Sequence, residues 1–318
     1  MPKALITTVP FALKNSKPLM ILEREKINYL VNPLGRKLKE NELAEMIEDF
    51  DVIIAGTEEI TEKVINNAKN LKLISRVGIG LDNINLQAAK NKGIFVTYTP
   101  DAPAPAVAEL TVGLIISLIR NIHVSNHFMH VGKWHRYFGK RISEITIGII
   151  GVGRIGKGVI NRLQSFSPKK ILINDIDPNK LQLSYPNIQK AEKQEIYENS
   201  DVISLHIPLN IQTKNLINYK HLNSMKPNSY IINTSRGGII NENDLIMALK
   251  EGKLSGAAVD VFENEPYQGG LLGINNCLLT SHMGSMTEDC RSRMEIEATE
   301  EVVRYFNSEK LKNPVQID

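Results

Sequence analysis

ITIGIIGVGRIGKGVINRLQ, residues 145–164, decides the fold of this chain. An apolar run ends at residue 150, the pattern G-x-G-x-x-G follows directly, and a helical pattern starts at once after it. A strand, such a loop and a helix in this order are typical of dinucleotide binding, because the glycines let the backbone approach a pyrophosphate at a helix N-terminus. We therefore expect a cofactor site whose loop residues are Gly151, Gly153, Arg154, Ile155 and Gly156.

The next apolar run, ILIND, ends at Asp175. An acidic residue at about this distance from the glycines hydrogen-bonds the adenosine ribose hydroxyls, and its charge repels the extra phosphate of NADP. No arginine follows at once, because residues 176–179 are Ile, Asp, Pro and Asn. The pattern therefore predicts NAD rather than NADP, with Asp177 as the alternative ligand if the strand ends later.

Apolar runs and helical patterns alternate on both sides of this unit. Six runs from residue 145 onward predict a doubly wound sheet with crossover helices, namely ITIGII, KILIND, DVISLHI, SYIINTS, SGAAVDVF and NCLLTS. In the first hundred residues, ALITT, DVIIAG, LKLISRV and GIFVTYT predict a smaller, flavodoxin-like parallel sheet. Helices are expected near Leu19–Leu30, Thr61–Asn70 and Leu86–Asn91.

The stretch TPDAPAPAVAEL, residues 99–110, separates the two alternations. Its prolines are not expected to continue a sheet or a helix, so a hinge is predicted there, followed by an apolar helix over Val107–Ile119. A charged, amphipathic pattern from Thr287 predicts a closing helix. The expected fold is α/β: two Rossmann-like or flavodoxin-like domains with a cleft between them, a substrate-binding domain of residues 1–99 plus 287–318 and an NAD-binding Rossmann domain of residues 100–286.

Composition and charge exclude several classes of protein. The net charge is only +3, from 38 basic and 35 acidic residues without a long basic run, so neither a nucleic acid nor a membrane surface is expected as a partner. The longest apolar stretch, Leu110–Ile119, is too short to span a bilayer. Two cysteines and a start without a signal-peptide pattern favour the cytoplasm.

Three later segments each follow a predicted strand, and the carboxyl ends of strands line the ligand crevice of open α/β sheets. They are NTSRGG (233–238), VDVFENEP (259–266) and LTSHMG (279–284). With RVGIGLDNI (76–84), AVAEL (106–110), GKW (132–134) and HIPL (206–209), this ordered set resembles the D-2-hydroxyacid dehydrogenase family, which includes phosphoglycerate, glyoxylate and D-lactate dehydrogenases.

The resemblance implies a catalytic triad of Arg236, Glu265 and His282 acting with NAD on a small 2-hydroxy or 2-keto acid. It also implies a homodimer built on a helical arm, with Trp134 near the partner's cleft. Further residues follow from position in the family: the backbone of Val77, Gly78 and Ile79 for the substrate carboxylate, Asp260 for the nicotinamide amide, and the backbones of Ile207, Thr234 and Ser235 along the cofactor.

The chemistry of these side chains agrees with that role. Hydride transfer to a 2-keto acid leaves an alkoxide, so a group that titrates near neutrality, such as His282, is needed to donate the proton. A carboxylate from Glu265 favours the charged imidazole and fixes its orientation, and Glu263 is the nearby alternative. The guanidinium of Arg236 binds a carboxylate in bidentate fashion and polarises the adjacent carbonyl.

Other features narrow the function. His123 and His127 have the i, i+4 spacing of metal ligands, but no carboxylate or cysteine accompanies them in a ligand pattern, and no metal is expected. Two acids after the strand DVIIAG, Glu58 and Glu59, disfavour a phosphorylated substrate, although Arg36 and Lys37 could offset them. The short C-terminal part predicts no regulatory domain.

Two alternatives belong to other branches. An NAD-sensing, corepressor-like interaction protein is disfavoured by the short termini, and a formate dehydrogenase is disfavoured because Glu265 stands where that branch has glutamine. A phosphite dehydrogenase of the same superfamily stays open.

Overall fold

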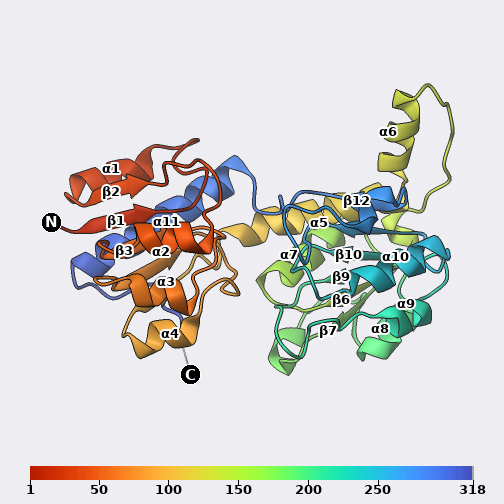
Figure 1. The fold of residues 1–318 in the computed structure, drawn as a ribbon. Helices are drawn as coiled ribbons and strands as arrows, with labels where there is room; N and C mark the ends of the chain where they lie inside the picture. The colour runs from red at the N-terminus through yellow and green to blue at the C-terminus, as the bar shows by residue number, and fades with distance from the viewer. Residues whose placement is uncertain (317–318) are drawn as a thin grey trace. The chain divides into compact units, whose positions relative to one another are not determined.

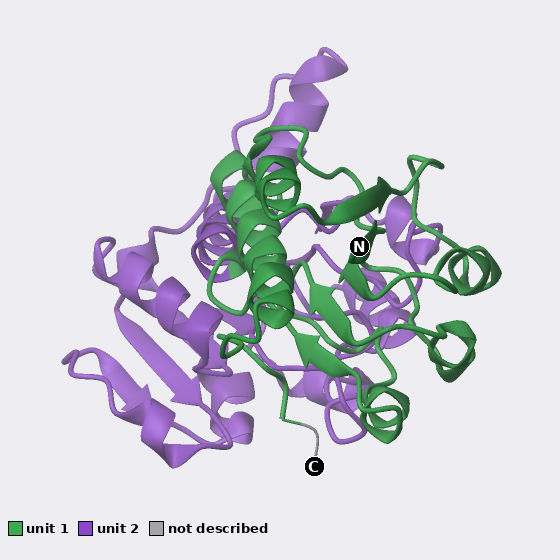
Figure 2. Cartoon of the chain, turned by 90° about the vertical axis from the view of Figure 1, so that its left-hand side faces the viewer, with its two compact units in different colours: residues 1–103, 286–318 green, residues 104–285 purple. Residues whose placement is uncertain are grey.

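The computed structural model describes residues 1–316 as two compact units. Unit 1 consists of Met1–Pro103 and Met286–Asp318, and unit 2 consists of Ala104–Ser285 (Figure 2). Unit 1 is therefore discontinuous along the chain, and unit 2 is inserted into it.

Unit 1 is a parallel sheet of five strands in the order β2-β1-β3-β4-β5 (Figure 1). The strands are β1 Lys3–Ile6, β2 Asn28–Val31, β3 Val52–Ala55, β4 Leu73–Arg76 and β5 Phe95–Thr97. The helices are α1 Lys17–Arg24, α2 Glu40–Met46, α3 Glu62–Asn67, α4 Leu86–Asn91 and α11 Glu288–Phe306. The helix predicted over residues 19–30 is wrong in its second half, because Lys26 has a φ of 54° that breaks the helix and lets β2 begin.

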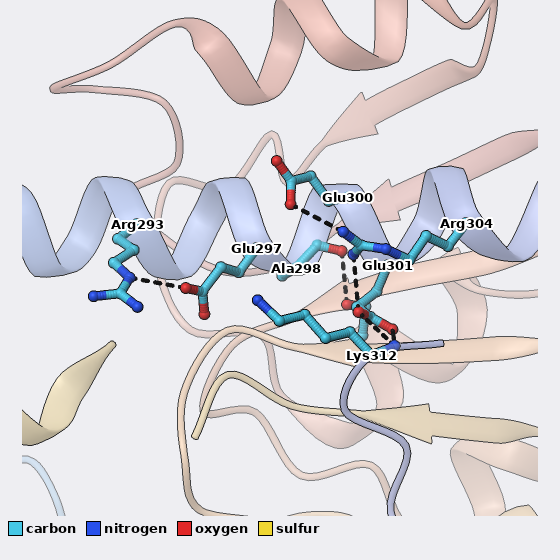
Figure 3. A network of polar contacts seen from close by, with 8 residues as sticks. Arg293, Glu297, Ala298, Glu300, Glu301, Arg304 and Lys312 are labelled. Atoms are coloured by element: carbon cyan, nitrogen blue, oxygen red, sulfur yellow. Dashed lines mark hydrogen bonds and ion pairs between the residues drawn. The ribbon is translucent and has the colours of Figure 1, made fainter. Parts of the chain in front are cut away.

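The last helix, α11, packs against β3, β4 and α1. Its buried face is held to the sheet by Ser75, whose Oγ donates to the carbonyl of Ala298 at 2.8 Å. The same helix carries the polar network of Figure 3, in which Arg304 pairs with Glu300 and with the buried Glu301. Both carboxylate oxygens of Glu301 also accept the amide of Lys312 at 3.1 Å. The network fastens the segment after α11 to the unit.

Unit 2 is a parallel sheet of seven strands in the order β12-β11-β10-β9-β6-β7-β8. They are β6 Thr146–Ile150, β7 Lys170–Asn174, β8 Ile188–Lys190, β9 Val202–Leu205, β10 Tyr230–Asn233, β11 Gly256–Val259 and β12 Cys277–Leu279. The order reverses between β6 and β9, which is where ligands bind in doubly wound sheets. Six strands were predicted; β8 was missed because Gln189 and Lys190 are exposed and interrupt any apolar run.

The expected break at residues 103–105 is also wrong in part. Helix α5 covers Pro103–Ile119, so Pro103 and Pro105 lie inside its first turn. The amides of a first turn have no acceptor within the helix, so proline is tolerated there. The other helices of unit 2 are α6 Ile122–His130, α7 Arg154–Gln164, α8 Lys193–Asn199, α9 Tyr219–Ser224 and α10 Glu242–Lys250.

Helix α5 lies in the core of unit 2, packed with residues of β6 and α7. Among the described residues, no single helix is both long enough and apolar enough to cross a membrane. Helices α5 and α6 meet these two criteria only when they are taken together, and a bend of 66° separates them.

Candidate active site

The glycine loop joins β6 to α7 and has room for a pyrophosphate. A Cβ on Gly151, whose φ is +97°, would collide with the carbonyl oxygen of His206, and a Cβ on Gly156 would collide with the carbonyl of Gly151. Gly153 is different, because a Cβ there would meet nothing within 4 Å. Gly153 is also the N-cap of α7 and offers no side chain to its first-turn amides. The loop therefore fits an anionic group at this helix N-terminus.

Asp175 follows β7 and faces the glycine loop. Its Oδ2 accepts the amide of Val152 at 2.7 Å, and its Oδ1 accepts the amide of Asp177 at 2.9 Å. Burial alone would raise the pKa of Asp175, but these two amides and the nearby Lys180 hold it below its ordinary value. Asp177 instead caps a short 3₁₀ helix, η2 Pro178–Leu181, by accepting the amide of Asn179.

His206 closes the loop from the end of β9. Its Nε2 lies 2.9 Å from the Oγ of Ser204, and burial lowers the pKa of His206 to about 3. The ring is therefore neutral at physiological pH. Ile207, predicted to line the cofactor, comes next, and its side chain borders Gly151.

The turn after β10 carries Arg236 and is organised by Asn233, a residue that the sequence analysis did not single out. The Oδ1 of Asn233 accepts from both the amide and the hydroxyl of Ser235, and its Nδ2 donates to the carbonyl of Arg236 at 2.8 Å. Thr234, the next residue, lies 2.9 Å from Thr111 of α5, hydroxyl to hydroxyl. An asparagine directly after an apolar strand is the signal that could have revealed this role.

Asp260 follows β11 and braces the turn that carries His282. Its Oδ1 accepts from the hydroxyl of Thr280 at 2.6 Å and from the amide of Met283 at 2.9 Å, and its Oδ2 accepts the amide of Gly284 at 3.0 Å. His282 itself has a φ of 51°, a conformation that is uncommon outside glycine and needs such support. Asp260 is 1% exposed, so its carboxylate is buried together with these three hydrogen bonds.

His282 and Glu265 form a direct pair. The Nδ1 of His282 lies 2.8 Å from the Oε2 of Glu265, whose Oε1 accepts the amide of Phe262 at 3.1 Å. Both side chains stay partly open to solvent, with exposures of 42% and 36%. Because β10, β11 and β12 are neighbours in the sheet, their carboxyl ends bring the turns with Arg236, Glu265 and His282 to the same edge.

Unit 1 carries the predicted carboxylate loop after β4. The amide of Val77 donates to the carbonyl of Ala55, and the amide of Gly78 donates to the hydroxyl of Thr99 at 2.8 Å. These two donors are therefore already engaged within the unit. The amide of Ile79 donates to no other residue in the part of the chain that the structure describes.

A cavity of about 80 Å³ adjoins this loop. Its lining includes Thr7, Thr57 and Val77, with the charged residues Lys37, Glu58, Arg76 and Arg291. Glu58 is 2% exposed and accepts from the amide of Gly56 at 2.9 Å and from the hydroxyl of Thr7. Of the two acids predicted to disfavour a phosphate, only Glu58 reaches the cavity. Arg36 points elsewhere and pairs with Glu42 at 2.6 Å.

The histidines of α6 do not form a metal site in the part of the chain that the structure describes. Residues 1–316 contain no group of three side chains suited to hold a metal ion. Instead, α6 and the segment after it present apolar side chains to solvent. Those exposed most strongly are Ile122, Met129, Val131, Trp134 and Phe138.

Comparison with known proteins identifies the family of the chain. Residues 112–284 match the model of the D-isomer specific 2-hydroxyacid dehydrogenase, NAD binding domain. A hydroxypyruvate reductase of Thermotoga maritima is 37% identical over 295 residues, which cover 89% of this chain and 95% of that one. A D-3-phosphoglycerate dehydrogenase of Methanocaldococcus jannaschii is 37% identical over 88% of this chain, which spans only 54% of the length of that relative. The crystal structure of an NAD-dependent formate dehydrogenase from Staphylococcus aureus in complex with NAD superposes with a TM-score of 0.86 at 27% identity, covering 100% of this chain and 99% of that one.

Proposed function

Because this chain belongs to the D-isomer specific 2-hydroxyacid dehydrogenases and contains their NAD-binding domain, we propose that it interconverts a short D-2-hydroxy acid and the matching 2-keto acid. The observation that supports this most is the pair of His282 and Glu265, 2.8 Å apart and beside the turn that carries Arg236. An imidazole held by a carboxylate next to a guanidinium is what proton transfer beside a carboxylate substrate requires.

NAD, when bound, takes up or supplies the hydride. The glycine loop and Asp175 would hold the pyrophosphate and the adenosine ribose of NAD, the backbones of Ile207, Thr234 and Ser235 would line its path, and Asp260 would serve the nicotinamide amide. Asp260 already accepts three hydrogen bonds from the His282 turn, so the same carboxylate links the cofactor side of the site to the acid.

His282 moves the proton. Its Nδ1 is on Glu265, so Nε2 is the atom that gives a proton to the carbonyl oxygen during reduction and takes the hydroxyl proton during oxidation. Glu265 keeps the ring in this orientation. Arg236 binds the substrate carboxylate and stabilises charge on the adjacent oxygen. In unit 1, the backbone of Val77, Gly78 and Ile79 stays the predicted segment for a substrate carboxylate.

The cavity beside Val77 supports a short substrate. At about 80 Å³ it has room for a substituent of only a few atoms beyond the 2-keto acid core. The charge of the wall does not decide between substrates, because the buried carboxylate of Glu58 is accompanied there by Lys37, Arg76 and Arg291, so the expectation rests on the size of the cavity. We therefore expect glyoxylate and hydroxypyruvate to be better substrates than phosphohydroxypyruvate.

The apolar arm from Ile122 to Phe138 supports assembly with a second copy of the chain. Trp134 is 76% exposed and Phe138 is fully exposed, and exposed aromatic side chains in one patch are typical of interfaces. We propose a homodimer. Its mass, measured by light scattering after size-exclusion chromatography, would be halved by Trp134→Glu together with Phe138→Glu.

The decisive experiment follows NADH absorbance with glyoxylate, hydroxypyruvate, pyruvate and phosphohydroxypyruvate. Turnover of the first two at higher kcat/KM than phosphohydroxypyruvate is expected. A preference for the phosphorylated acid would contradict the substrate proposal. NADH binding without turnover of any of the acids would contradict the proposed reaction itself.

A further inference from the structure

A lysine stands beside the carboxylate that is expected to select NAD. The Nζ of Lys180 lies 3.5 Å from the Oδ1 of Asp175 and 3.9 Å from the Oδ2 of Asp177. It comes from η2, whose start is set by the Asp177 cap and by Pro178 at its first turn. The 3₁₀ turn thus folds Lys180 back toward the end of β7.

Asp175 and Lys180 differ in how far their side chains are buried. The side chain of Asp175 is only 7% exposed and is fixed by the amides of Val152 and Asp177, whereas the side chain of Lys180 is 42% exposed. Asp175 therefore stays in place, and the ammonium group at the end of a flexible stem is free to turn toward a ligand.

Selection against NADP depends on charge at this position. A carboxylate at the adenosine ribose repels a 2′-phosphate, and sites that accept NADP supply a cation there instead. Here the cation is present together with the carboxylate. No arginine follows Asp175 directly. The lysine five residues later could not be connected with Asp175 from the sequence, because only the turn of η2 places Lys180 next to that carboxylate.

We propose that Lys180 determines the cofactor specificity of this chain, by offsetting the charge of Asp175 so that the site accepts NADP as well as NAD. This inference rests on the proposed function, in which Asp175 holds the adenosine ribose. Lys180 is the cation for the 2′-phosphate of NADP, and in the presence of NAD its partner is Asp175.

The test is titration of the protein with NADH and NADPH, followed by nucleotide fluorescence, which needs no turnover. Lys180→Ala should raise the ratio of the NADPH Kd to the NADH Kd by about tenfold, the equivalent of one modest charge interaction, and Lys180→Glu should raise it further. Lys180→Arg keeps the cation and should preserve the ratio. Lys169→Ala, which removes an equal charge in the exposed turn before β7, should leave the ratio unchanged.

A second readout separates this role from a structural one. In the unmodified chain, NADPH binding should weaken with added salt more than NADH binding does, and this difference should shrink in Lys180→Ala. An unchanged Kd ratio in Lys180→Ala, or an equal loss of both nucleotides, would overturn the inference while leaving the proposed function intact. Failure of the unmodified chain to bind either nucleotide would overturn both.

Discussion

The carbonyl oxygen of His206 occupies the place where a Cβ on Gly151 would have to stand. Two residues further on, a Cβ on Gly153 would meet nothing within 4 Å. The two glycines of one motif thus serve different needs: the first lets the chain pass β9, and the second leaves room for a ligand. The first prediction exploits this contrast.

Gly151→Ala should destabilise the fold by about 3 kcal/mol, because it adds a steric overlap to a positive φ. Gly153→Ala should change the free energy of unfolding by less than about 1 kcal/mol but raise the Kd of NADH by at least about tenfold, because the new methyl group projects into the pyrophosphate site. Urea unfolding and NADH titration measure the two effects. Equal stability losses in both variants would contradict the proposed difference between a crowded Gly151 and an open Gly153.

Removal of the proposed acid should separate chemistry from binding. His282→Ala and Glu265→Gln should each lower kcat by about 10²- to 10⁴-fold, the range that general acid–base groups contribute. The Kd of NADH should stay within about twofold of the unmodified value, a change worth under 0.5 kcal/mol. Lys169→Ala, in the exposed turn before β7, is the control. Normal turnover by His282→Ala would remove this residue from the mechanism.

Arg236 should not be replaceable by lysine. Arg236→Lys keeps the charge but loses the two-pronged geometry that a carboxylate needs, so KM should rise and kcat should fall together. In Arg236→Ala, added guanidinium ion should restore part of the lost rate. If lysine supports full activity, the bidentate role of Arg236 is wrong.

His206 should make the stability of unit 2 depend on pH. Burial lowers its pKa to about 3, so between its ordinary value of about 6.5 and that value the unfolded chain binds a proton that the folded chain excludes. Stability from this group is complete above about pH 6.5 and is lost as the pH falls.

The melting temperature measured between pH 7.5 and 5 should therefore drop less in His206→Gln than in the unmodified chain. A parallel decline in both proteins would mean that His206 is protonated without cost.

Much of the fold could be predicted because its strands are short, apolar and bounded by turn residues. Glycines, a following helix and an acidic residue at the end of the next strand mark the β6–α7–β7 unit regardless of the rest of the chain. Strands β2 and β8 could not be predicted in the same way, since exposed residues interrupt their apolar character and make them look like loop, and only pairing to β1 and β7 makes them strands.

The site was predictable where a motif follows a strand and less so where a side chain acts from a distance. The turns with Arg236, Glu265 and His282 follow adjacent strands, so parallel topology alone brings them to one edge. The bracing by Asn233, the burial of Glu58 and the return of Lys180 depend on the conformation of the turns, which a pattern of residue types does not specify. The sequence shows that Glu58 is acidic, but it does not show that its side chain is buried in the wall of the cavity.

The path of the chain through unit 1 has a consequence for its biosynthesis. The sheet of unit 1 is complete once β5 has been made, but the helix that covers β3 and β4 is α11, which lies some two hundred residues later in the sequence. A ribosome must therefore finish the whole inserted unit before the first one can close its core. Until then one face of that early sheet is apolar and bare, and it is during this interval that a nascent chain would depend most on chaperones.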